Sequence, residues 1–294
     1  MSRPPTFVPP ACARARRLRT ARGDFAVLEA TPRDGLGPRG TALLLPGYTG
    51  SKEDFIALLQ PLTEAGYRVL AVDGRGQYET PGPDDESAYA QGELALDVLA
   101  QATAADPAGA GVHLLGHSLG GQIARAALLA DPSCFTTLTL MSSGPAEVAP
   151  AQREKVALLS GALATMTMAE VWEAMRALDP PEEADDPKSD RADLRHRWLL
   201  HNPAQLVATG RALTVESDRV AELTALRPAP PVHVISGVRD DTWPVPLLDD
   251  MATRLGAHRT VVAGAEHSPN TDRPAETARA LAAFWDRHPA DGRR

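Results

Sequence analysis

The sequence predicts an α/β protein with a mostly parallel sheet that is covered by helices on both faces. Short runs of residues that are apolar on both faces recur along the chain, and helix-length segments separate them. This alternation stops once, over residues 146–230, where only helical patterns occur. The 294 residues, 43% of them hydrophobic, suffice for one large domain with a packed core.

The predicted elements follow from these patterns along the chain. The strands are the apolar runs at residues 25–30, 42–45, 69–72, 112–115, 138–141, 232–235 and 260–262. Helices are predicted at residues 92–105, 119–130 and 277–287, and within the helical stretch at 156–163, 169–178, 191–201 and 203–213. We expect residues 1–15, rich in Pro, Arg and Ala, to be a flexible arm, and the acidic run 179–190 to be a solvated loop.

Charge and composition exclude several function classes. With 30 basic and 38 acidic side chains, the net charge of −8 argues against binding nucleic acid over a broad surface. Nothing approaches 18 consecutive apolar residues, so we expect no membrane span, and the N-terminus lacks the apolar run of a secretory signal. The two cysteines, Cys12 and Cys134, form no CxxC motif, which is typical of a reducing compartment. We therefore expect a cytoplasmic globular protein.

The strongest functional signal is a G-x-S-x-G motif at residues 116–120, centred on Ser118. It follows the predicted strand 112–115 and opens the predicted helix 119–130, which is the context this motif requires. A sharp strand-to-helix turn holds the serine in a strained conformation with its hydroxyl exposed, and the helix N-terminus favours a developing negative charge. The motif therefore predicts that Ser118 is a catalytic nucleophile.

A serine hydroxyl needs a general base, and His267 is the best candidate among eight histidines. It lies in a loop after the last predicted strand and before the final helix, where a base can meet Ser118. His117, although it is next to the nucleophile, is expected to point its ring away.

The base needs an acid to orient it, and two adjacent aspartates follow the strand 232–235. The chain order Ser, Asp, His is the one found in this kind of architecture. We prefer Asp240, with Asp241 as the alternative acid.

These residues resemble the α/β-hydrolase superfamily, and within it the capped serine esterases and lipases of the monoacylglycerol-lipase-like kind. The resemblance extends from about Arg16 to His288 and rests on residues 43–50, 73–76, 116–121, 237–240 and 267–269. It implies an α/β-hydrolase fold: a mostly parallel eight-stranded sheet flanked by helices, with an inserted helical cap. The implied core domain is 16–145 with 231–290, and the implied cap is 146–230.

The resemblance also implies an oxyanion hole made by the backbone N–H groups of Tyr48 and Leu119. This sequence has Pro46 where the family commonly has histidine, a change that leaves the backbone donor in place. The cap is expected to set specificity, because it covers the serine with large apolar side chains. The alternative is that the side chains on its helices form the cap's own core or pack where the cap sits on the sheet domain. The candidate pocket residues are Met166, Met168, Trp172, Met175, Trp198 and Trp243.

The predicted function is hydrolysis of carboxylic esters with small or medium apolar acyl groups, through an acyl-enzyme on Ser118. A C–C bond hydrolase, an acyltransferase or a perhydrolase would use the same triad, and a non-catalytic ligand-binding member of the fold is a further alternative. No motif for a metal or a nucleotide cofactor occurs, so none is expected. The expected partner is a small-molecule ester, and the sequence leaves open whether the protein is a monomer or a dimer.

Overall fold

A computed structural model describes residues 3–32, 38–177 and 191–290. Within these ranges one sheet of eight strands forms, in the order β1-β2-β4-β3-β5-β6-β7-β8. The strands are β1 (Ala13–Thr20), β2 (Gly23–Ala30), β3 (Gly40–Leu45), β4 (Tyr67–Val72), β5 (Val112–His117), β6 (Phe135–Met141), β7 (Val232–Gly237) and β8 (His258–Val262). All seven predicted strands are therefore present.

The strands are parallel except at one edge, where β2 runs against both β1 and β4. In the centre of the sheet Leu43 of β3 pairs with Leu70 of β4 and Leu114 of β5. Because strand side chains alternate between faces, Leu43 and Leu44 enter two different hydrophobic cores. This parallel arrangement brings the carboxyl ends of β3, β5 and β7 to the same edge of the sheet.

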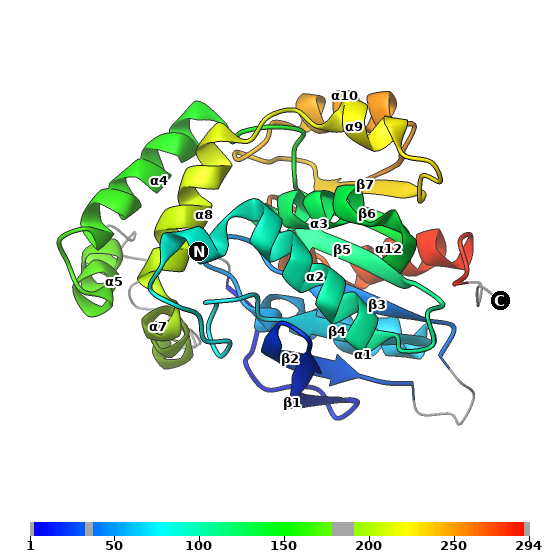
Figure 1. The fold of residues 1–294 in the computed structure, drawn as a ribbon, viewed down its shortest axis with the longest axis horizontal. Coiled ribbons are helices and arrows are strands. Elements are labelled where there is room, and N and C mark those ends of the chain that lie inside the picture. The colour runs from blue at the N-terminus through cyan, green and yellow to red at the C-terminus, as the bar shows by residue number, and fades with distance from the viewer. Residues whose placement is uncertain (1–2, 33–37, 178–190, 291–294) are drawn as a thin grey trace.

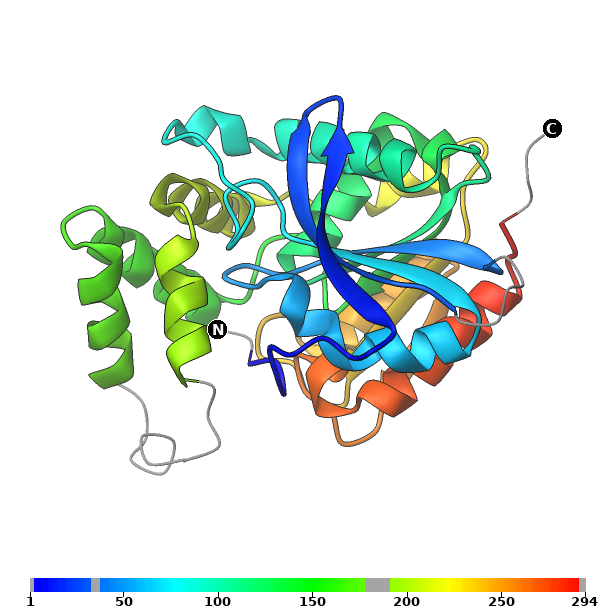
Figure 2. The same ribbon diagram turned by 90° about the horizontal axis from the view of Figure 1, so that it is seen from below.

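Helices cover both faces of the sheet, as the alternating pattern predicts (Figures 1 and 2). One face packs against α1 (Ile56–Glu64) and α12 (Pro274–Asp286), and the other against α2 (Gln91–Ala105), α3 (Leu119–Ala130) and α10 (Val245–Leu255). Helix α10, which the predicted elements do not include, buries Leu248, Met251 and Ala252 on one helical face.

A helical segment lies between β6 and β7 along the chain; its described helices lie at the left of Figure 1, except the last, which lies beside α10. Its described helices are α4 (Pro150–Leu163), α5 (Met168–Ala177), α7 (Arg191–Leu200), α8 (Pro203–Val215) and α9 (Val220–Ala225). The predicted acidic loop 179–190 lies outside the described residues. The segment packs beyond the carboxyl ends of the central strands, and Val148 N–H donates to the carbonyl of Leu213 at 3.0 Å.

Strand β1 corrects the predicted arm, because residues 13–15 belong to the sheet rather than to a flexible leader. Its sequence is rich in arginine, which masks the strand pattern. As an edge strand it can keep most of these side chains in solvent while Leu18 is buried. Arg16 is also held by the neighbouring strand, where its Nε donates to Glu29 at 2.6 Å.

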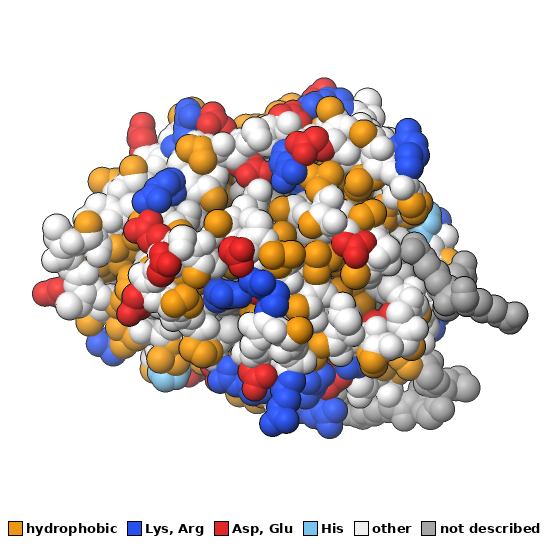
Figure 3. All heavy atoms as spheres, viewed as in Figure 1, with side chains coloured by type: hydrophobic (Ala, Val, Ile, Leu, Met, Phe, Trp, Pro, Cys, Tyr) orange, Lys and Arg blue, Asp and Glu red, His pale blue; other side chains and the backbone are white. Residues whose placement is uncertain are grey.

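Basic and acidic side chains are interspersed over the face shown in Figure 3. In the described ranges, no helix has the length and apolar composition needed to cross a membrane.

Candidate active site

Ser118 occupies the sharp turn between β5 and α3, with a backbone φ of +54°. The turn is possible because two glycines flank the serine at i−2 and i+2. A Cβ on Gly116 would lie 2.2 Å from the carbonyl oxygen of Gly120, and a Cβ on Gly120 would lie 2.4 Å from that of Leu45. Strand and helix therefore pass too closely for any side chain but hydrogen. This geometry places Ser118, which is only 7% exposed, at the carboxyl edge of the sheet and at the N-terminus of α3, where it lines a pocket.

His267 and Asp240 form a direct hydrogen-bonded pair. The imidazole Nδ1 lies 2.9 Å and 3.0 Å from the two carboxylate oxygens of Asp240, which is fully buried. The same carboxylate accepts N–H bonds from Thr242 at 2.8 Å and Trp243 at 3.1 Å. A carboxylate held by such donors acts as an acceptor, so the Nδ1 proton of His267 points at it. The other ring nitrogen, Nε2, is then the one available for proton transfer.

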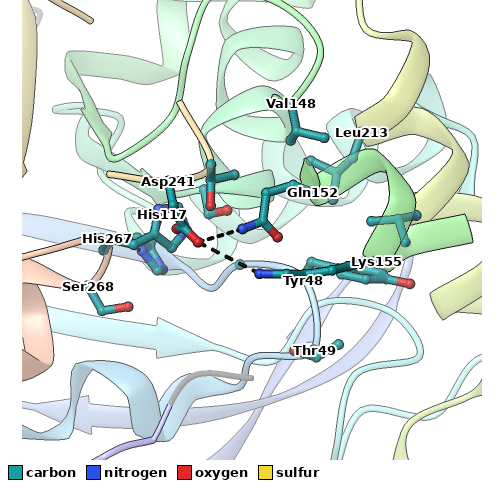
Figure 4. A pocket seen from close by; sticks show the side chains of 14 residues that line it. Tyr48, Thr49, His117, Val148, Gln152, Lys155, Leu213, Asp241, His267 and Ser268 are labelled. Carbon is teal, nitrogen blue, oxygen red and sulfur yellow. Dashed lines mark hydrogen bonds and ion pairs between the residues drawn. The ribbon is translucent and has the colours of Figure 1, made fainter. Parts of the chain in front are cut away.

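Asp241, the alternative acid, has different surroundings. Its carboxylate accepts a hydrogen bond from Gln152 Nε2 at 2.8 Å and lies 3.8 Å from the ammonium of Lys155 (Figure 4). Its side chain is 72% exposed. Of the two adjacent aspartates, only Asp240 bonds to His267 among the hydrogen bonds of the described residues.

His117 is closer to the site than the sequence suggests, because its ring lines the pocket rather than pointing away. Its Nε2 lies 2.9 Å from the backbone oxygen of His267, so Nε2–H donates to that carbonyl, and the two imidazole centroids are 5.1 Å apart. Burial and the neighbouring His267 lower the pKa of His117 to about 4. The ring is therefore neutral at pH 7 and helps to hold the His267 loop.

Tyr48 follows β3, and its side chain is fixed against the helical segment. The phenol O–H donates to the carbonyl of Leu206 in α8 at 2.9 Å, and Gly210 leaves room for the ring. A Cβ on the preceding Gly47 would lie 3.1 Å from the Cβ of Ser118, so the loop that carries Tyr48 runs directly beside the serine turn. Tyr48 and Leu119 thus belong to two neighbouring backbone turns at the same edge.

A buried ion pair ties this loop to helix α7. Arg197 Nη1 donates to Asp54 Oδ1 at 2.8 Å and to Ser51 Oγ at 3.3 Å, and both charged side chains are fully buried. His201, one turn later, lies with its Nε2 3.1 Å from the carbonyl oxygen of Gly50. The helical segment therefore holds the backbone that follows Tyr48.

We expect Arg197→Met to lower the free energy of unfolding by about 3–5 kcal/mol, because it removes the buried guanidinium that donates to Asp54 Oδ1 and Ser51 Oγ. The matched control is Arg195→Met on the same helix, whose partner Glu173 is 3.8 Å away and exposed. That control is expected to cost less than about 0.5 kcal/mol. Denaturant unfolding of both variants measures the difference, and equal losses would contradict a special role for the buried pair.

A pocket of about 340 Å³ lies at this edge of the sheet (Figure 4). Its wall includes Ser118, His267 and His117 from the core, together with Tyr48. The remaining lining residues are Gly47, Thr49, Val148, Gln152, Lys155, Val156, Leu213, Asp241, Thr242 and Ser268. Gln152 and Lys155 are two pocket residues that the sequence analysis does not identify.

The six predicted pocket residues lie elsewhere, since none is among the described residues that line this pocket. Met166, Met168, Trp172, Met175 and Trp198 belong to a hydrophobic cluster of the helical segment, against which Phe7 and Tyr48 also pack. Trp198 is fully buried there, and its Nε1–H donates to the carbonyl of Met168 at 2.6 Å. Trp243 is also buried, and its Nε1–H donates to the carbonyls of Ala146 and Glu147. The apolar part of the pocket wall is instead made of Val148, Val156 and Leu213.

In the described ranges, no group of three or more His, Cys, Asp or Glu side chains is arranged to hold a metal ion.

Comparison with known proteins identifies the family. The sequence model of the alpha/beta hydrolase family matches residues 42–280. A 2-hydroxy-6-oxononadienedioate/2-hydroxy-6-oxononatrienedioate hydrolase of Cupriavidus pinatubonensis is 33% identical over 220 residues, which is 71% of each chain. A protein of the same name from Paraburkholderia xenovorans is 31% identical over 221 residues, 72% of each chain.

Solved structures share the fold. A thermophilic esterase from Thermogutta terrifontis superposes with a TM-score of 0.73 at 20% identity, covering 94% of this chain and 100% of that one. The enol-lactonase from Burkholderia xenovorans gives a TM-score of 0.73 at 17% identity, covering 92% of this chain and 100% of that one. Because the family match spans the core strands and the serine turn, and the relatives align over most of their length, the chain belongs to the alpha/beta hydrolase family.

Proposed function

We propose that the protein is a hydrolase in which Ser118 attacks a substrate carbonyl, His267 accepts the serine proton and Asp240 orients the imidazole. The observation that supports this most directly is the 2.9 Å contact between His267 Nδ1 and Asp240, at a pocket that Ser118 also lines. A base held in this way offers Nε2 to the pocket, and the chain order Ser, Asp, His agrees with the assignment.

The proposed reaction has two steps. Ser118 Oγ bonds to the carbonyl carbon, and the carbonyl electron pair moves onto the oxygen, which accepts hydrogen bonds from the N–H groups of Tyr48 and Leu119. One donor of this kind is worth about 3 kcal/mol of transition-state stabilisation. The leaving group departs with a proton from His267. Water, deprotonated by His267, then attacks the acyl carbon and releases Ser118.

The substrate that we propose is a carboxylic acid with a 6-oxo group, cleaved at a carbon–carbon bond beside that ketone. The support comes from the curated relatives, whose names specify a 2-hydroxy-6-oxo-dienedioate or trienedioate. The ketone gives Ser118 a carbonyl to attack. The 2-hydroxy-diene first tautomerises to the 2-oxo form, in which the carbon beside the 6-oxo group is sp3. When the bond to the ketone carbon breaks, its electron pair is delocalised as a dienolate onto the 2-oxo oxygen, which is then protonated. The net reaction adds one water across the carbon–carbon bond.

We further propose that residues 146–230 form a cap over a core made of 16–145 and 231–290. Helices α4 and α8 supply Gln152, Lys155 and Leu213 to the pocket, so they face the serine. Such a cover would keep bulk water from the reacting atoms.

Ester hydrolysis by the same residues is the second candidate. It is favoured by Val148, Val156 and Leu213, which give the pocket an apolar wall suited to an acyl chain.

Turnover of 2-hydroxy-6-oxononadienedioate, compared with p-nitrophenyl butyrate, tests the choice. Cleavage beside the ketone shortens the conjugated system, so loss of its absorbance reports the reaction. We expect kcat/KM for the ketone to exceed that for the ester by at least about 10-fold. Turnover of the ester alone would favour the second candidate, and turnover of neither, by folded protein, would contradict both.

A further inference from the structure

Helix α4 contributes two polar side chains to the catalytic pocket that the proposed reaction does not use. Gln152 and Lys155 are three residues apart and therefore share a helical face with Val156, which also lines the pocket. In Figure 4 the ammonium of Lys155 is directed towards Asp241.

The ammonium of Lys155 is weakly engaged by its neighbour. Its nitrogen is 3.8 Å from Asp241, beyond hydrogen-bond distance, and the side chains are 65% and 72% exposed. Exposed pairs of this kind contribute little to stability. Asp241 takes its hydrogen bond from Gln152 instead, at 2.8 Å. Lys155 therefore makes no hydrogen bond to Asp241 that an incoming anion would have to break. An anion that enters the pocket can bind the ammonium of Lys155 in place of Asp241.

The rest of the pocket indicates what such an anion would be attached to. Val148, Val156 and Leu213 supply an apolar wall next to the lysine, while Ser118 and His267 supply the reacting end. A ligand that satisfies both parts has a carbonyl at one end, a short apolar chain, and a carboxylate at the other. The names of the curated relatives specify substrates with two carboxylates, which agrees with this order of groups.

We propose that Lys155, assisted by Gln152, binds the carboxylate of an anionic acyl group whose carbonyl lies at Ser118. This inference rests on the proposed function, since it assumes that Ser118 is where the carbonyl reacts. Lys155 is then a specificity-determining residue: it selects anionic acyl groups over neutral ones of the same length.

A matched pair of esters tests the proposal: p-nitrophenyl adipate with a free carboxylate, and its methyl ester. We expect the wild-type protein to hydrolyse the free acid with the higher kcat/KM. Lys155→Gln should lower kcat/KM for the acid by about 10- to 100-fold, as expected for the loss of a charge-assisted hydrogen bond, and change the methyl ester by less than about 3-fold. Asp241→Asn should raise kcat/KM for the acid, because it removes the competing carboxylate.

Arg153→Gln is the matched control, since Arg153 lies on the same helix but outside the pocket wall, paired with Glu147. It should leave the preference between the two esters unchanged. Binding of adipate to the Ser118→Ala variant, with and without Lys155→Gln, gives a readout that does not need turnover. A Lys155→Gln change that weakens neither adipate binding nor acid hydrolysis overturns the inference. If no ester is hydrolysed but adipate binding depends on Lys155, the carboxylate site at Lys155 stands and the proposed reaction at Ser118 fails.

Discussion

Ser118→Ala is expected to lower kcat by about 10⁵- to 10⁶-fold, a loss of about 7–8 kcal/mol of transition-state stabilisation. The variant removes the atom that would form the covalent bond, while the pocket wall and the N–H groups of Tyr48 and Leu119 remain. KM should therefore change much less than kcat. Steady-state kinetics on the substrate with the highest turnover measure both.

Ser268→Ala is the matched control, because Ser268 is a second serine in the wall of the same pocket. Ser268 is not held in the turn between β5 and α3, where the nucleophile is proposed to lie. We therefore expect the kcat of the Ser268→Ala variant to stay within about 10-fold of the wild type. Comparable losses in the two variants would mean that Ser118 has no special role.

Asp240→Asn is expected to lower kcat by about 10³- to 10⁴-fold. The asparagine can present its amide N–H₂ to His267 Nδ1, which favours the tautomer with the proton on Nε2. That tautomer cannot accept a proton from Ser118. The fold should be retained, because the amide oxygen can still accept the N–H bonds of Thr242 and Trp243.

Asp241→Asn provides a matched comparison at the next residue. It removes the same charge from an exposed side chain that accepts its hydrogen bond from Gln152, so on the neutral methyl ester we expect a change in kcat of less than about 10-fold. A larger loss for Asp241→Asn than for Asp240→Asn would make Asp241 the triad acid.

The sequence could predict the order of strands and helices because buried parallel strands and long amphipathic helices have clear patterns. It could not show β1, whose arginines hide an edge strand that is stabilised by pairing with β2. It also places the start of α4 too late. The helix begins at Pro150, six residues before the predicted start at 156, so Gln152 and Lys155 fall outside the predicted helix.

The sequence predicts a site residue well only where the local backbone geometry alone determines its position. The glycines around Ser118 specify a strand-to-helix turn by themselves. The choice between Asp240 and Asp241 depends on which carboxylate the turn after β7 directs at His267, and two adjacent identical residues carry no such information. Met175 and Trp198 are predicted pocket residues because they are large apolar side chains on helices of a cap that is expected to cover the serine. Periodicity identifies an apolar face but not what that face packs against, which here is the cluster inside the helical segment.

Covalent labelling by a fluorophosphonate tests the central claim most directly. The reagent reacts with serine only where a base removes the proton and an oxyanion site receives the charge. We predict that intact-mass analysis shows addition of one reagent per chain, that peptide mapping assigns it to Ser118, and that the label is absent in Ser118→Ala and strongly slowed in Asp240→Asn. Folded wild-type protein that stays unlabelled, or that carries the label at another residue, would contradict the account.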